Sequence, residues 1–106
     1  MSSELQIADI NSAWTVYAII RRINNGKVWQ TTNSTFVTYV TANIANYDIA
    51  LTVQGTNSGF AVADFPSAIT AGIYSVAIYR QLGGSPAEGD EYLGGGNIEW
   101  NGHNVY

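Results

Sequence analysis

The sequence contains no cysteine and few charged residues. Without cysteine, the chain can form neither disulfides nor a cysteine-ligated zinc site. Charged residues make up 11% of the chain, against about 25% in typical soluble proteins. Four basic residues against eight acidic ones give a net charge of −4, so the basic surface that binds nucleic acid or anionic lipid cannot form. We therefore expect no nucleic-acid partner and no membrane partner.

Long apolar runs are also missing. No segment approaches the ~20 apolar residues that a membrane-spanning helix needs. The first residues, 1–4, lack the basic start and apolar stretch of a signal peptide. We expect synthesis in the cytoplasm, a destination such as a virion or other particle, and a single domain over residues 1–106 with loose ends at 1–4 and 102–106.

The sequence does contain short segments in which apolar residues alternate with polar ones. Residues 59–66 and 72–79 each begin with glycine, and Pro66 ends the first segment, which predicts two consecutive antiparallel strands. The residues expected to face the core are Phe60, Val62 and Phe65 in the first strand, and Tyr74, Val76 and Ile78 in the second. Ile73, Ala77 and Tyr79 form a second apolar face, which needs a cover.

The N-terminal half shows the same character. Residues 5–10 predict an edge strand, and residues 14–23 predict a strand that is apolar on both faces. One face would meet the core, and the other would be covered either by a loop of the same chain or by another subunit. The residues at 24–26, Asn-Asn-Gly, predict a hairpin turn that returns the chain through residues 27–31.

The remaining segments complete an all-β pattern. Residues 36–46 fit neither a helix nor a strand cleanly and predict an irregular connection with one helical turn at 42–45. Residues 47–53 alternate, which points Tyr47, Ile49, Leu51 and Val53 inward. After a loop at 83–91, the three glycines at 94–96 predict a bulge or a close backbone approach before a last strand at 97–100. We expect an antiparallel, immunoglobulin-like β-sandwich of about seven short strands with at most one helical turn.

Residues 14–102 resemble small uncharacterised β-domain proteins encoded by tailed phages and environmental bacteria. The residues that carry this resemblance are Tyr47-Asp48-Ile49, Thr52, Gly55, Gly59-Phe60, Phe65-Pro66, Ala71-Gly72-Ile73-Tyr74, Tyr79-Arg80-Gln81, Gly84-Ser85-Pro86, Gly95-Gly96 and Ile98-Glu99-Trp100-Asn101-Gly102. The resemblance implies a structural or attachment module that works as a repeated copy in a larger assembly. It implies no catalytic residue.

The candidate chemical groups are sparse. His103 is the single histidine and has no accompanying nucleophile motif, so we interpret it as a solvated tail residue. Glu88, Asp90 and Glu91 could offer oxygen ligands to calcium, but their spacing does not match the known calcium loop, and a solvated acidic loop is favoured. We predict no catalytic residue, no metal, no cofactor and no enzyme activity.

Aromatic residues are the remaining functional signal, because tyrosine and tryptophan combine an apolar face with a polar edge. We predict that Tyr17, Trp29, Tyr79 and Trp100 form an interface or ligand platform. Tyr74, two residues after Gly72, is instead expected to be a buried corner tyrosine. The preferred function is a self-associating structural or attachment module, in a phage particle. The alternative is a carbohydrate-binding module or adhesin with a glycan on its exposed tryptophan and tyrosine side chains.

Overall fold

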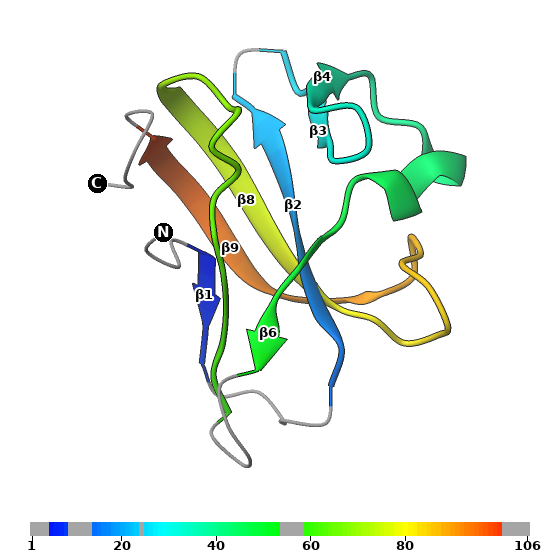
Figure 1. Cartoon of the computed structure of the whole chain (residues 1–106). Helices are drawn as coiled ribbons and strands as arrows, with labels where there is room; N and C mark the ends of the chain where they lie inside the picture. Colours follow the sequence, from blue (N-terminus) through cyan, green and yellow to red (C-terminus); the bar gives the residue numbers. More distant parts are fainter. Residues whose placement is uncertain (1–4, 9–13, 24, 54–58, 101–106) are drawn as a thin grey trace.

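Two antiparallel β-sheets pack face to face in the computed structural model, which describes residues 5–8, 14–23, 25–53 and 59–100 (Figure 1). This confirms the all-β, sandwich-like prediction. The elements are β1 (Leu5–Ile7), β2 (Val16–Arg22), β3 (Val28–Gln30), β4 (Thr35–Val37), a 3-10 helix η1 (Thr41–Asn46), β5 (Ile49–Ala50), β6 (Thr52–Val53), β7 (Ala61–Ala63), β8 (Gly72–Arg80) and β9 (Glu91–Trp100). They include nine strands rather than about seven, and η1 is longer than the single expected turn because two 3-10 turns merge at Asn43.

The larger sheet has the order β4-β3-β2-β8-β9, and the smaller one has the order β1-β7-β6. β2 pairs with β8 along one edge, and β3 and β5 share its other edge. The predicted hairpin joins β2 to β3, where the Arg22 N–H donates to the Lys27 carbonyl at 2.8 Å and Gly26 has a φ of 69°. Glycine adopts this conformation without the steric cost of a side chain. Asn24 and residues 9–10 of the predicted first strand lie outside the described residues.

The two strands predicted as a consecutive pair do not pair with each other. β7 belongs to the smaller sheet and β8 to the larger one. The connection between them crosses the sandwich, because Phe65 and Ile69 are buried in the core and Ile69 N–H donates to the Pro66 carbonyl. Alternation therefore identified both strands, but the expectation that consecutive strands pair with each other was wrong.

Of the three residues predicted to face the core around β7, Phe65 is buried as expected, but the prediction for Phe60 and Val62 is wrong by one position. Ala61 is buried and Ala63 packs against the core, whereas Phe60 and Val62 are only half-buried. Side chains alternate between the two faces of a strand, so Phe65 shares its side with the two alanines. Small residues at 61 and 63 leave room for the aromatic side chain at 65.

The main core contains the face of β8 that was predicted to be buried. Two of the core aromatic residues, Tyr74 and Trp100, carry a polar atom that needs a hydrogen-bond partner. Tyr74 is buried, and its hydroxyl donates to the Thr70 carbonyl at 2.6 Å. The Trp100 Nε1–H donates to the Ile69 carbonyl at 2.8 Å. Both polar atoms therefore have partners, as buried polar groups require. The burial predicted for Tyr74 is confirmed.

A second apolar cluster covers the other face of β2. It consists of Tyr17, Ile19, Val28 and Tyr47, with Tyr39 and Ile44 packed against it. The cover is therefore the chain's own segment around η1, which decides between the two alternatives left by the sequence. Tyr47 was expected to face the main core with Ile49 and Leu51, but it follows η1 rather than lying in a strand, and it packs on the opposite side.

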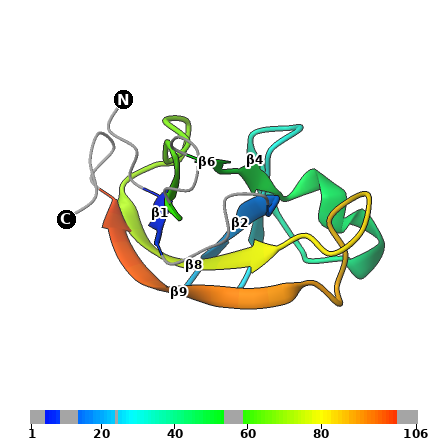
Figure 2. The ribbon, with the colours of Figure 1, turned by 90° about the horizontal axis from the view of Figure 1, so that it is seen from below.

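β9 is longer than the predicted last strand. It begins at Glu91 and pairs with β8 over its whole length, with a register shift opposite Ile78 and Tyr79 that leaves Leu93 as the extra residue. The bulge lies one residue before the glycines at 94–96, where a bulge or a close backbone approach was predicted. Seen from below, β1 and β6 lie on one side of β8 and β9 (Figure 2).

Candidate functional site

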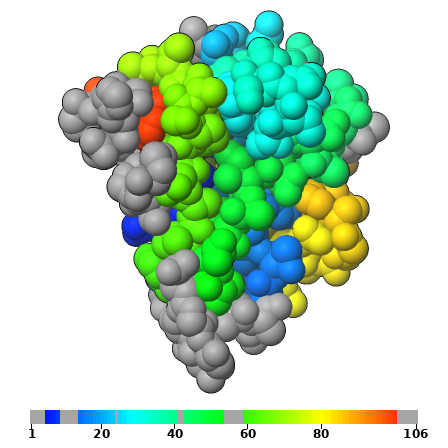
Figure 3. Space-filling view, viewed as in Figure 1, coloured from blue at the N-terminus to red at the C-terminus, as the bar shows by residue number. Residues whose placement is uncertain are grey.

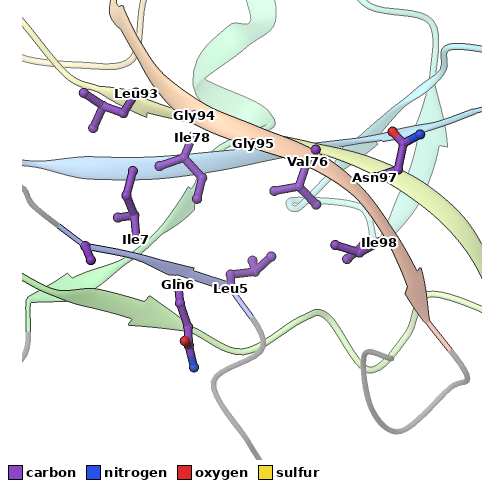
Figure 4. A pocket seen from close by; sticks show the side chains of 12 residues that line it. Leu5, Gln6, Ile7, Val76, Ile78, Leu93, Gly94, Gly95, Asn97 and Ile98 are labelled. Carbon is purple, nitrogen blue, oxygen red and sulfur yellow. The ribbon is translucent and has the colours of Figure 1, made fainter.

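A groove of about 490 Å³ lies between β1 and β9. Its floor is formed by Val76 and Ile78 of β8, and its walls include Ile7 of β1 and Leu93 and Ile98 of β9. Ile7 and Ile78 point toward each other across the groove, whereas Gln6 and Asn97 point away from it (Figure 4). None of the lining residues is charged. Both the volume and the apolar lining are typical of binding sites.

The groove exists because its two walls are edge strands of different sheets. β1 is the edge of the smaller sheet and β9 the edge of the larger one, so no described strand closes the sandwich between them. On the β9 side, the glycines at 94–96 carry no side chains that could fill the space. A Cβ atom added at Gly96 would meet no atom within 4 Å. The sequence pattern therefore leaves an apolar channel open along the backbone of β9.

The free edge of β9 is long and weakly protected. The strand has ten residues and pairs with β8 on one side, with no described strand on the other. Native edge strands are usually blocked by lysine, proline or a bulge, because their outward N–H and C=O groups accept additional strands. β9 has a bulge at Leu93 and glutamates at 91 and 99, near its two ends, but no charged residue and no proline between Gly94 and Ile98. The stretch from Gly94 to Ile98 can therefore accept an extended segment.

Three of the four residues predicted as a platform are buried. Trp29, Trp100 and Tyr17 have exposed fractions of 4%, 1% and 1%, so the expectation that they form an exposed platform is wrong. The two tryptophan rings instead pack against other aromatic rings inside the chain. The Trp29 ring packs against Phe36 at 5.1 Å, and the Trp100 ring packs against Phe65 at 4.5 Å between centroids.

The fourth residue, Tyr79, is half-buried against the second apolar cluster and belongs to a row of tyrosines. Tyr17, Tyr79 and Tyr92 occupy neighbouring positions on β2, β8 and β9, and successive ring centroids are 5.7 Å apart. Tyr92 is 59% exposed. The sequence prediction missed it because residue 92 followed the expected loop, and the strand character of 91–93 depends on pairing with β8.

Asp90 fixes the loop after β8 to this row of tyrosines. Its carboxylate accepts hydrogen bonds from the Tyr17 hydroxyl at 2.6 Å, the Ala87 N–H at 2.9 Å and the Leu82 N–H at 3.1 Å. The loop packs beside the start of β2 (Figure 3), where the Gln81 N–H donates to the Thr15 carbonyl.

Burial and hydrogen bonds shift the pKa values of Tyr17 and Asp90. Burial and the hydrogen bond to Asp90 both raise the pKa of the Tyr17 hydroxyl. Burial acts to raise the pKa of Asp90, but the three hydrogen bonds that it accepts outweigh burial and hold the pKa below the ordinary value. Burial raises the pKa of Asp48.

The acidic loop residues have roles within the chain. Asp90 holds the loop, and Glu91 lies 3.4 Å from Arg80, whose guanidinium also stacks on Trp14. Within the described ranges, no three histidine or acidic side chains gather into a group that could hold a metal ion. His103 lies outside the described residues.

Comparison with family models, curated proteins and solved structures finds no match for the chain. None of the helical residues described in the structure forms a helix long and apolar enough to cross a membrane.

Proposed function

We propose that the chain is a non-enzymatic structural or attachment module that associates with copies of itself. The observation that supports this proposal is the open edge of β9 beside an uncharged apolar groove. Association along this edge removes apolar surface from water and gives partners to backbone groups that otherwise face solvent.

The low net charge and the exposed apolar side chains also favour contact between copies of the chain. A net charge of −4 on 106 residues produces little mutual repulsion. Ile73, near the start of β8, and Leu82, two residues after its end, are 57% and 58% exposed. Large apolar side chains at such positions favour contacts with other molecules.

The setting in a phage particle rests on the sequence resemblance alone. The immunoglobulin-like assignment is likewise a proposal, and the hydrogen bond from Tyr74 to the Thr70 carbonyl supports it. A tyrosine whose hydroxyl returns to the backbone a few residues upstream is a feature of that family of sandwiches.

Sedimentation equilibrium and light scattering on the full chain test self-association. We expect the mean mass to rise above 11.4 kDa as the concentration increases from about 1 μM to about 1 mM. A mass that stays at the monomer value throughout would exclude the proposal.

Glycan binding is a second candidate, on a smaller surface than the sequence suggested. Tyr79 and the exposed Tyr92 ring lie in edge contact, and aromatic rings of this kind pack against sugar faces. A glycan array should show binding that Tyr92→Ala removes. Leu82→Ala is the matched control, because Leu82 is equally exposed. The absence of binding to any glycan, or equal loss in both variants, would reject this candidate.

A further inference from the structure

We infer that self-association occurs through β9, which pairs antiparallel with β9 of a second copy about a twofold axis at Gly96. This inference rests on the proposed self-association and specifies its geometry. The pairing joins the two larger sheets into one continuous sheet and closes the groove in both copies. An interface in which each copy uses the same surface gives a closed dimer rather than a filament.

The pairing of β9 with β8 fixes which way its residues face. Ile98 is paired with Tyr74, Gly96 with Val76, and Gly94 with Ile78. Directly paired residues point to the same side of a sheet, and Tyr74, Val76 and Ile78 belong to the buried core. A side chain at position 94, 96 or 98 therefore faces the groove side.

The twofold axis at Gly96 places a large side chain of each copy opposite a glycine of the other. It places Ile98 of each copy directly opposite Gly94 of the other, in the same row as Ile78. Ile98 of the second copy then enters the groove near Ile7, which faces Ile78. Because Gly94 and Gly96 have no side chains, nothing in the first copy competes for that space.

Neighbouring registers are less favourable. An axis at Gly95 brings Glu91 of one copy opposite Glu99 of the other, and like charges at paired positions destabilise a sheet. An axis at Asn97 places Ile98 of one copy opposite Gly96 of the other, in the row of Val76. The axis at Gly96 places it opposite Gly94, in the row of Ile78, which faces Ile7 across the groove. The charges and the position of the groove therefore favour the axis at Gly96.

Disulfide trapping tests the register, since the chain has no cysteine of its own. In Gly96→Cys, the two new thiols sit opposite each other at the axis, where paired Cβ atoms in antiparallel strands are about 4.5–5.5 Å apart, near the distance that a disulfide spans. We expect oxidation to a covalent dimer about a hundredfold faster than in Ser85→Cys, an exposed loop control.

Asn97→Cys distinguishes the neighbouring register, because position 97 meets its own copy only when the axis lies there. Faster trapping at 97 than at 96 would overturn the inferred register. Trapping at both 96 and 97 that is no faster than at 85 would show that β9 is not the interface.

A charge placed in the groove provides an independent test. Gly96→Lys meets no atom within 4 Å at its Cβ and should leave the monomer folded, as should Gly84→Lys in the loop after β8. We expect Gly96→Lys to weaken association at least about tenfold, a change of about 1.4 kcal/mol, and Gly84→Lys to leave it unchanged. Urea unfolding of both variants verifies that each remains folded.

The outcomes separate the two proposals. A wild-type chain that stays monomeric at every concentration removes self-association and, with it, the β9 interface. A wild-type chain that associates, but whose association survives Gly96→Lys without trapping at position 96, overturns the β9 interface and leaves self-association standing.

Discussion

Two adjacent glycines in β9 should respond in opposite directions to the same substitution. A methyl group built on Gly95 would overlap the carbonyl oxygen of Val76 and lie 3.0 Å from the Cα atom of Ala77, all within the backbone of β8. A methyl group on Gly96 would meet no atom within 4 Å. Gly95→Ala must therefore displace one strand, whereas Gly96→Ala adds a group in open space.

The magnitudes follow from these surroundings. Gly95→Ala forces backbone apart in a ladder that runs from Gly72 and Trp100 to Arg80 and Glu91. Overpacking costs about 1–3 kcal/mol, and each weakened hydrogen bond adds about 1 kcal/mol, so we expect a loss of about 2–4 kcal/mol. Gly96→Ala restricts the unfolded chain without strain, and we expect a gain of about 0.4–1 kcal/mol.

Urea unfolding followed by tryptophan fluorescence measures both changes, because Trp29 and Trp100 are buried in the folded chain. The measurement uses concentrations near 1 μM, so that association does not contribute to stability. Thermal midpoints should move in the same directions, by about 4–8 °C for each kcal/mol. Two variants with stabilities within about 0.5 kcal/mol of each other would refute the close approach of β8 and β9 at Gly95.

Two further predictions concern polar contacts. Tyr74→Phe should cost about 1–2 kcal/mol in urea unfolding because the Thr70 carbonyl loses its donor; Tyr74→Ala should cost about 3–5 kcal/mol, and a loss below about 1 kcal/mol would contradict its burial. The lowered pKa of Asp90 stabilises the folded chain above the unfolded value of about 3.9, and this contribution disappears as the pH falls through the lower folded pKa. Urea unfolding from about pH 7 to about pH 2 should therefore show wild type more stable than Asp90→Asn near neutrality and a shrinking difference below about pH 4; a difference independent of pH would contradict the role of the charged carboxylate.

The local features of the fold were readable from the sequence. The turn before Lys27 contains a glycine that adopts the positive φ a tight hairpin requires. Tyr74 follows a glycine at the start of an alternating strand, and the structure buries it as expected. The glycines at 94–96 indicated a bulge or a close approach; the close approach occurs at Gly95, and a bulge lies beside the glycines at Leu93. Each of these features depends on residues close together in the chain.

Which strands pair with each other could not be predicted in the same way. Alternation specifies which residues share a face, but not which strand lies alongside. β7 and β8 follow each other in the chain and nevertheless belong to different sheets, because Phe65 and Ile69 anchor their connection in the core. Trp29 and Trp100 were expected outside, but their rings pack in the core against Phe36 and Phe65, which lie far from them in the sequence or on another strand.

The groove was also beyond the reach of local patterns. Its walls come from Ile7 near the start of the described chain and from Leu93 and Ile98 near its end. No spacing in the sequence connects these residues, since they meet only when two edge strands of different sheets come together. The one local signal was Gly94–96, which was interpreted as a backbone feature and not as the wall of a binding site.

The pairing of β2 with β8 has a consequence during protein synthesis. β8 reaches the ribosome's catalytic centre 52 residues after β2 at the Arg22–Tyr74 pair and 64 residues after it at the Val16–Arg80 pair. At about 5–20 residues per second, this interval is about 3–13 s. Throughout that time β2, whose first five residues are apolar, lacks its main partner, and such segments are prone to aggregate. The rate of translation between these two strands therefore sets how long each new chain depends on chaperones or on dilution to remain folding-competent.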